Sequence, residues 1–272
     1  MTIDLDAYFR RIGYSGDRKP TLATLRELHR LQPAAIAFEN LSPLLGRSVS
    51  IDAASLHKKM VADGRGGYCY EQNLLLGSVL DALGFKFRNV TGWPRWQVAP
   101  GRLLPRTHLL LLITIDDDDW IADVGFGGNT LTAPLRLDER GAQQTPHEPA
   151  RIVERDGMLM IQPNIKGEWH DLVAFGLEQQ NFAELEMGNW FTSTHPRSRF
   201  RNELFMARSD AGARYGLLDN VLTTHRLGRA TERRTLESVA AFREVMTDVF
   251  RIRPPADPLL DATLARLAEK AA

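Results

Sequence analysis

Residues 64–73 read GRGGYCYEQN and place Cys69, the only cysteine of the chain, where a glycine-rich turn gives way to an apolar helical pattern. Leu75, Val79 and Leu83 fall within about 100° on one helix face, and Gly84 is placed to end that helix. A thiol in the first turn faces unpaired backbone N–H groups and the positive end of the helix dipole, both of which favour the thiolate. The stretch therefore predicts a nucleophilic cysteine at the start of a helix with one buried face.

The bulk composition is that of an ordinary globular protein. The chain has 272 residues, of which 43% are hydrophobic, so a sizeable core is expected. Its 34 Lys and Arg residues balance 34 Asp and Glu residues, and no basic surface for nucleic acid or an anionic membrane is expected. A small-molecule or protein partner is favoured instead, and no feature selects between a monomer and a homodimer.

The sequence also indicates a compartment. A single cysteine cannot form an internal disulfide, which fits a reducing environment. The first six residues, MTIDLD, have neither the basic nor the apolar part of a signal peptide. The longest aliphatic run, residues 109–113, is far shorter than the about 18 residues of a membrane helix. We expect a cytoplasmic protein with no membrane span.

The pattern along the chain predicts helices, then strands, then a mixed end. In the first third, cap residues and apolar spacing predict helices at 5–12, 22–31, 53–61 and 69–83. Short β-type runs then predict a mostly antiparallel sheet or barrel with strands at 85–90, 108–115, 120–124, 151–153, 158–161 and 169–175. Hairpin turns are expected at 156–157 and 166–167, and a long ordered loop at 92–105. The end predicts a helix from 178 to 190, strands near 200–206 and 215–224, and helices at 236–250 and 259–271.

Two polar residues of the strand region complement the thiol. His108 heads an apolar strand, and Asp123 stands among apolar neighbours at the end of the next strand. A cysteine nucleophile needs a base for its proton and a third group that orients the base, and these residues supply both. Alone, each is more often structural: a lone His or Asp is usually hydrogen-bonded in place, and a lone Cys usually packs as a small apolar side chain.

Four separated blocks match one family of enzymes. They are FENL at 38–41, RGGYCYEQN at 65–73, TH at 107–108 and DVGFG at 123–127, and STHP at 193–196 fits a later family segment. With these blocks in this order over the whole length, the chain resembles the arylamine N-acetyltransferases, which move an acetyl group from acetyl-CoA to aromatic amines and hydrazines. The resemblance implies a catalytic triad of Cys69, His108 and Asp123.

The resemblance also implies a fold. It is an α+β fold with a papain-like cysteine-nucleophile core. We expect three domains: a helical bundle at 1–84 that carries Cys69, a central antiparallel β-barrel at 85–188 that carries His108 and Asp123, and a C-terminal α/β lid at 189–272.

The implied reaction is a ping-pong transfer through an acetyl group on Cys69, with acetyl-CoA as co-substrate and no tightly bound cofactor. One alternative keeps the fold but changes donor or acceptor, as in an amide synthase or a hydrolase. Another is a non-catalytic binding protein in which Cys69 merely packs. No metal site is expected, because the run DDDD at 116–119 reads as a solvated turn and the histidines lack ligand spacing.

Further residues are candidates for binding. For the acceptor pocket they are the aromatic residues Phe38, Phe126, Phe200 and Trp96. As isolated aromatic residues they would be assigned to the core, and it is the resemblance that suggests Phe38, Phe126 and Phe200 as pocket walls. For acetyl-CoA they are Gly128, Phe126, Thr107 and Asn73.

Some residues near Cys69 have simpler expected roles. Glu71 and Asn73 lie where helix-start electrostatics and backbone hydrogen bonds would use them. Arg65 could pair with a carboxylate such as Glu39 as a structural brace.

The spacing of His108 and Asp123 sets a geometric condition on the triad. If residues 117–118 formed a two-residue hairpin turn, Asp123 would lie opposite Leu112, four residues from His108. At the strand rise this is about 13 Å, too far for a hydrogen bond. A shifted or bulged strand register, or strands that do not form a plain hairpin, is therefore expected if the triad forms.

Overall fold

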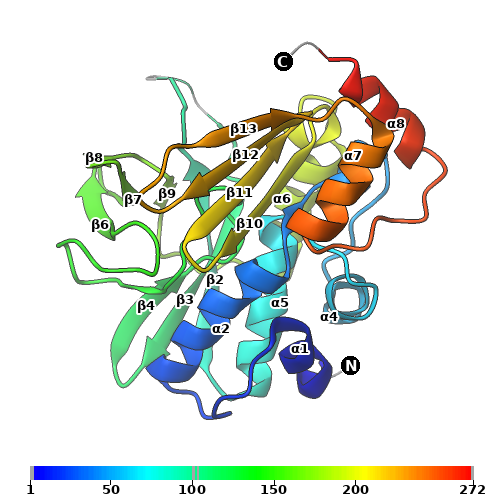
Figure 1. The fold of residues 1–272 in the computed structure, drawn as a ribbon. Coiled ribbons are helices and arrows are strands. Elements are labelled where there is room, and N and C mark those ends of the chain that lie inside the picture. Colours follow the sequence, from blue (N-terminus) through cyan, green and yellow to red (C-terminus); the bar gives the residue numbers. More distant parts are fainter. Residues whose placement is uncertain (1–2, 100–101, 103, 271–272) are drawn as a thin grey trace.

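An N-terminal group of helices is followed by two antiparallel sheets in the computed structural model, which describes residues 3–99, 102 and 104–270 (Figure 1). Part of the predicted 92–105 loop, at residues 100, 101 and 103, lies outside the described residues, as does the predicted end of the last helix at residue 271.

The N-terminal helices follow the predicted caps. Their bounds are α1 Leu5–Ile12, α2 Leu22–Ala35, α4 Ala53–Leu56 with a π-helical continuation His57–Ala62, and α5 Cys69–Ala82. The side chains of Asp4, Thr21 and Asp52 each accept a hydrogen bond from the first turn of the helix that follows. The predicted starts of these helices are therefore confirmed.

The predicted end of α2 is wrong, because the helix continues through Pro33. Proline removes the hydrogen bond that residue 33 would donate to the carbonyl of His29. The last turn keeps other partners: the N–H of Ile36 bonds to Gln32, and Arg11 donates to the carbonyl of Ala35 at 2.7 Å. One lost bond therefore does not stop a helix whose end is held from outside.

A short strand interrupts the helical region, where none was predicted. Strand β1, Phe38–Glu39, is followed by helix α3, Leu41–Leu44. β1 pairs antiparallel with a strand more than 160 residues later, β10 (Phe205–Asp210). Its two residues carry too little pattern to be recognised locally, and only the long-range pairing creates the strand.

The first sheet supplies the predicted barrel. Its strands are β2 Lys86–Pro94, β3 His108–Ile115, β4 Asp118–Ala122, β5 Leu135–Arg136, β6 Ala150–Arg155, β7 Met158–Ile165, β8 Glu168–Trp169 and β9 Val173–Phe175. The order is β5-β4-β3-β2-β9-β7-β6, with β8 beside β7. Gln143 bonds to Arg136 on one edge and bridges to Ala150 on the other, so the sheet nearly closes. The turns at 156–157 and 166–167 are confirmed, with positive φ at all four residues.

The C-terminal third holds the second sheet. Its elements are α6 Phe182–Thr194, a 3₁₀ turn Arg199–Arg201, β10, β11 Ala213–Leu218, β12 Val221–Arg226, β13 Glu232–Thr235, α7 Val239–Glu244 with a π-helical continuation Val245–Val249, and α8 Leu260–Ala268. The strand predicted near 200–206 begins only at Phe205, because the 3₁₀ turn occupies its first residues. The sheet order is β1-β10-β11-β12-β13.

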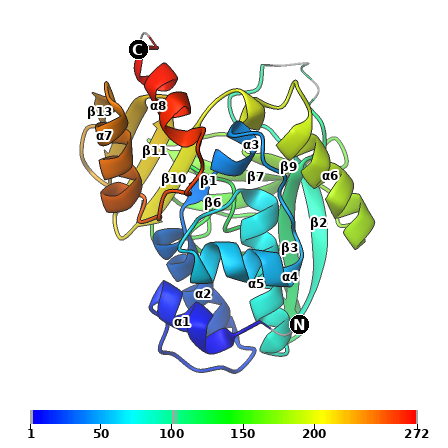
Figure 2. The same ribbon diagram turned by 90° about the vertical axis from the view of Figure 1, so that its right-hand side faces the viewer.

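Three of the four buried hydrophobic clusters among the described residues hold these layers together. The first packs α1, α2 and α5 against β3 and β4, and a second fills the barrel. A third packs α7 and α8 against the second sheet, as Figure 2 shows, and it also takes in Ala37 and α3. Ala37, Leu41, Leu44 and Leu45 thus share a cluster with the C-terminal helices.

Two features were searched for in the described part of the chain. No helix there has the length and apolar character to cross a membrane. No three His, Cys, Asp or Glu side chains there are grouped so as to hold a metal ion.

Candidate active site

Cys69 is the first residue of α5, and glycines bring the chain to it. The N–H of Gly67 donates to the carbonyl of Ala37, and the N–H of Glu39 donates to the carbonyl of Gly67. A Cβ on Gly66 would lie 2.0 Å from the carbonyl oxygen of Ala37. Only glycine allows the two segments to approach this closely, and the approach fixes where α5 begins.

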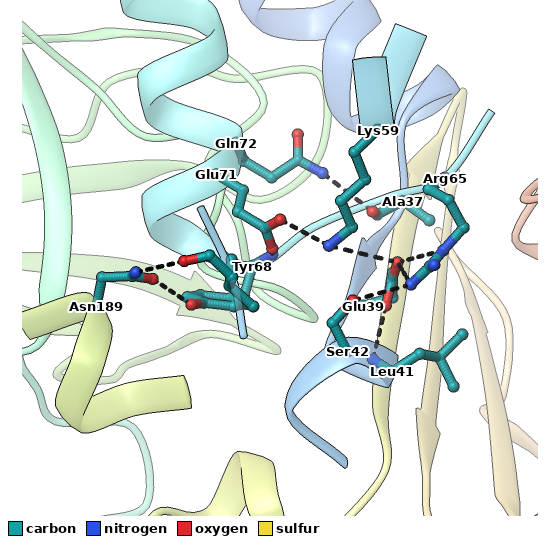
Figure 3. Close-up of polar contacts among 11 residues, drawn as sticks. Ala37, Glu39, Leu41, Ser42, Lys59, Arg65, Tyr68, Glu71, Gln72 and Asn189 are labelled. Carbon is teal, nitrogen blue, oxygen red and sulfur yellow. Dashed lines mark hydrogen bonds and ion pairs between the residues drawn. The ribbon is translucent and has the colours of Figure 1, made fainter. Parts of the chain in front are cut away.

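The residues around this turn carry four charges, drawn in Figure 3. Arg65 donates from two nitrogens to Glu39, at 2.9 and 2.7 Å, so the predicted brace is confirmed. Lys59 donates to Glu71 at 2.6 Å, and Glu71 accepts the N–H of Tyr68 at 3.1 Å. The helix-start role expected for Glu71 is thus confirmed.

The hairpin before Asp123 turns one residue earlier than expected. Ile115 pairs with Asp118, and residues 116 and 117 form the turn with φ of 49° and 64°. A two-residue turn of this kind needs positive φ at both positions, which Asp tolerates. Since all four residues of the run 116–119 are Asp, the sequence alone could not select the pair that turns.

The change of turn brings the base and the carboxylate together. β3 and β4 pair with Leu111 opposite Ala122, so Asp123, just beyond β4, falls beside Leu110 rather than four residues from His108. Diagonal neighbours on a sheet are within reach of long side chains. Nε2 of His108 lies 2.7 Å from Oδ2 of Asp123. The expected register shift is confirmed, and no bulge is needed.

The carboxylate of Asp123 is held on every side, and it is fully buried. Its Oδ1 accepts hydrogen bonds from the amide of Asn73 at 3.1 Å and from the N–H of Gly125 at 2.9 Å. Its own N–H donates to Nε2 of His29 at 3.1 Å. The sequence did not single out His29 for this site, and only a contact across 94 residues shows its role.

Burial and charge together set the protonation of these groups. Burial disfavours the charged imidazolium, but Asp123 and, less strongly, Cys69 outweigh it and raise the pKa of His108 to about 10. Burial raises the pKa of Asp123, but His108, Asn73 and Gly125 outweigh it, so that pKa lies below its usual value. Burial lowers the pKa of His29 to about 4, so His29 is neutral and its Nε2 accepts.

The thiol lies beside the start of β3. Sγ of Cys69 is 3.6 Å from the carbonyl oxygen of Thr107, the residue before His108. A Cβ on Gly125 would come within 2.8 Å of Cα of Cys69, so a glycine is required where the segment 123–127 passes the helix start. The structure therefore brings together the three residues that the sequence singled out for nucleophile, base and orienting group.

Three of the four predicted pocket aromatics line this region. The rings of Phe38 and Phe200 meet edge to face at 5.8 Å, and both pack with Cys69 and Tyr68. The ring of Phe126 lies 5.2 Å from that of His108. Cys69 is only 5% exposed, so the thiol is almost buried in its cluster, against which Phe38 and Phe200 pack.

Trp96 does not join this group. Its ring lies edge to face with His170 at 5.5 Å and packs on the barrel core. The expectation that it lines the acceptor pocket is not supported. An isolated tryptophan in a loop gives no signal of which core it will cover, since that depends on the path of the loop.

Of the residues predicted to contact acetyl-CoA, some are accessible and one is buried. Gly128 is exposed, with open space where a Cβ would stand, and Thr107 is half-buried beside the thiol. Asn73 is fully buried. Its amide nitrogen donates to the carbonyl of Leu109 and to Asp123, and its amide oxygen accepts the N–H of Val124. A contact between Asn73 and a co-substrate is therefore not supported, because the side chain has no path to the surface.

Comparison with known proteins decides the family. The sequence model of a family described as N-acetyltransferase matches residues 21–257. The arylamine N-acetyltransferase of Mycolicibacterium smegmatis is 40% identical over 256 residues, which are 93% of each chain. That of Escherichia coli strain K12 is 40% identical over 251 residues, 92% of this chain and 89% of its own. The chain belongs to the arylamine N-acetyltransferases.

The fold agrees with that of solved members of the family. The structure of the Mycobacterium marinum arylamine N-acetyltransferase in complex with CoA superposes with a TM-score of 0.93 at 39% identity. The match covers 97% of this chain and 99% of that one. The α+β architecture with an antiparallel barrel, which the sequence resemblance implied, is confirmed.

Proposed function

We propose that the chain transfers an acetyl group from acetyl-CoA to the nitrogen of aromatic amines or hydrazines through an acetyl group on Cys69. The observation that carries this proposal is the 2.7 Å contact between His108 and Asp123 next to a cysteine at a helix start. The family membership and the CoA complex of the mycobacterial relative support acetyl-CoA as the donor.

The three expected ranges 1–84, 85–188 and 189–272 stay a proposal for the domain division.

The first half-reaction loads the cysteine. Because Nε2 of His108 faces Asp123, its Nδ1 is the nitrogen available to take the thiol proton of Cys69. The thiolate attacks the thioester carbon, and the N–H of Cys69 is the candidate donor to the oxyanion. The bond from that carbon to the CoA sulfur breaks, and CoA leaves with the proton from His108.

The second half-reaction removes the acetyl group from Cys69. An arylamine is neutral at pH 7, so its nitrogen attacks the acetyl carbon directly. His108 takes the amine proton, the bond between that carbon and Sγ breaks, and the acetylated amine departs. Asp123 stays ionised and keeps the ring in place throughout.

Binding roles follow from exposure. Gly128 and Thr107 are proposed contacts for the CoA arm, since Gly128 is exposed with open space beside it and the carbonyl oxygen of Thr107 lies 3.6 Å from the thiol. Phe38, Phe126 and Phe200 are proposed walls for the flat acceptor ring. Because Cys69 is only 5% exposed, we expect side chains around it to move when the acceptor enters.

The test is intact-protein mass spectrometry after addition of acetyl-CoA. Wild type is expected to gain one acetyl group, and Cys69→Ala none. Addition of an arylamine should then remove the group and yield the acetylated amine.

Two results would contradict the proposal. One is a wild-type chain that stays unmodified, as a non-catalytic binding protein would. The other is an adduct that is lost to buffer as fast as to arylamine, which is the behaviour of a hydrolase.

A further inference from the structure

Behind the turn that leads to Cys69 lies a nearly buried group of four charges: Glu39, Lys59, Arg65 and Glu71 (Figure 3). Both carboxylates are fully buried, and the side chains of Lys59 and Arg65 are 19% and 11% exposed. Two negative charges thus face two positive ones. A buried charge is tolerated only with such partners, and removing one partner leaves the other uncompensated.

The two carboxylates are held differently. Glu39 has two bonds from Arg65 and one from the N–H of Leu41 at 2.6 Å. Within the described residues, Lys59 is the one cation within ion-pair distance of Glu71, at 2.6 Å, and it also lies 3.9 Å from Glu39. Lys59 is therefore the cation that balances the charge of Glu71, beside the hydrogen bond from the N–H of Tyr68.

Glu71 in turn fixes the backbone before the thiol. Its Oε2 accepts the N–H of Tyr68, the residue next to Cys69. A Cβ on Gly67 would lie 2.7 to 2.9 Å from atoms of the Glu71 side chain, so that side chain is folded tightly over the turn. A shift of the Glu71 carboxylate would therefore move the start of α5.

We propose that Lys59 is a positioning residue of this site, which pairs with Glu71 and so holds the backbone of Tyr68 and the thiol of Cys69 in place. The inference rests on the proposed function only for the role of Cys69. The contacts that carry it do not depend on that role.

The surrounding charges explain why the cation is needed. Burial raises the pKa of Glu71, Glu39 raises it further, and Lys59 opposes both. Arg65 acts on the pair through Glu39, whose pKa it lowers against burial. Without Lys59, Glu71 would face Glu39 with no cationic partner, and its pKa would rise further.

The first experiment replaces only the charge. Lys59→Met keeps an unbranched side chain of similar length but removes the ammonium group. Lys59→Arg keeps the positive charge. The matched control is Lys58→Met, because Lys58 is the preceding residue but its side chain is 74% exposed. Lys59→Met is expected to slow the acetylation of Cys69 at pH 8 by about 10- to 100-fold, because a small displacement of reacting groups has this effect. Lys59→Arg should restore most of the rate, and Lys58→Met should match wild type.

The second experiment follows thermal unfolding against pH and needs no activity. In Lys59→Met, Glu71 has a raised pKa in the folded state, so stability should fall as pH rises from 5 to 8. We expect the Tm at pH 8 to lie about 5 °C or more below that of Lys59→Arg. Adding Glu71→Gln to Lys59→Met removes the carboxylate but keeps an acceptor for Tyr68. The double variant should lose this pH dependence and recover part of the rate.

Three results would overturn the inference. They are wild-type acetylation by Lys59→Met at every pH, equal losses in Lys59→Met and Lys59→Arg, and a double variant as pH-dependent as Lys59→Met. If wild type itself acquires no acetyl group, the proposed function fails, and the Tm comparison still tests the coupling of Lys59 to Glu71.

Discussion

At the scale of single residues, the behaviour of each group is set by its neighbours more than by its type. His108 and His29 are both buried, yet one has a pKa of about 10 and the other of about 4. The difference is Asp123, whose carboxylate contacts the ring of His108 while only its backbone N–H contacts His29. Asp123 therefore keeps the imidazole of His108 charged, while His29 stays neutral and accepts a hydrogen bond.

Asp123→Asn tests this account. The amide keeps the shape but removes the charge that outweighs burial, so His108 should become neutral and the thiolate lose its counter-charge. The rate of Cys69 acetylation is expected to fall by about 1000-fold or more. The measurement is single-turnover mass spectrometry with acetyl-CoA. Acetylation within tenfold of wild type would exclude the proposed role of Asp123.

The same variant has a predicted pH signature in stability. His108, with a raised pKa, stabilises the fold fully below its ordinary value of 6.5 and loses this contribution as pH rises towards 10. Asp123, with a lowered pKa, contributes above its ordinary value of 3.8 and loses this as pH falls. The Tm advantage of wild type over Asp123→Asn should therefore be greatest between pH 3.8 and 6.5. A constant difference from pH 4 to 9 would contradict the pairing.

At the scale of elements, the start of α5 depends on two segments that touch through glycine. The turn at 64–67 and strand β1 lie so close that a methyl group at Gly66 would meet a backbone carbonyl. Backbone cannot move aside as a flexible side chain can. The position of Cys69 is thus a property of the contact between the two segments and not of the helix alone.

Gly66→Ala should therefore be costly. Overpacking of this kind destabilises by about 1–3 kcal/mol, which corresponds to a Tm lower by about 2–12 °C for a chain of this size. The matched control is Gly216→Ala in β11, where a Cβ would meet nothing within 4 Å and φ is not positive. Thermal unfolding of both variants decides the point. Equal Tm values for the two would show that the turn can relax.

Element prediction from the sequence succeeded where the signal is local. Helix caps and the hairpin turns at 156–157 and 166–167 follow from neighbouring residues. The errors lie where distant parts decide. Pro33 stays inside α2 because Arg11 supports the last turn, and β1 exists because β10 pairs with it.

At the scale of the whole molecule, Arg214 joins the second sheet to the loop at 128–130, which follows Asp123. It reaches from β11 to Glu148, at 3.0 and 2.8 Å, and to the carbonyl of Thr130 at 2.9 Å. A weaker contact at 3.4 Å reaches the carbonyl of Gly128, the proposed CoA contact. Both partners of the ion pair are nearly buried, so the pair links two layers that share no strand.

Arg214→Met should weaken both stability and co-substrate binding. Loss of one partner of a nearly buried pair costs on the order of 3 kcal/mol. Release of the loop at 128–130 should raise KM for acetyl-CoA more than it lowers kcat. The matched control is Arg226→Met, whose pair with Glu232 is exposed and contributes about 0–1 kcal/mol. The measurements are thermal unfolding and steady-state kinetics; an unchanged KM would separate Arg214 from the CoA site.

The sequence by itself determined the local features: a lone cysteine at a helix start that follows glycines, the helix caps and the tight turns. Its family blocks also indicated His108 and Asp123 as the partners of Cys69. Short-range backbone sterics and capping bonds set these features, so they can be read from adjacent residues. Only the tertiary structure decided the pairing of His108 with Asp123, the support from His29 and the ion pair between Lys59 and Glu71. These depend on strand register and on which segments share a buried space. A one-residue change of turn moves every partner by two positions, and no local pattern fixes that choice.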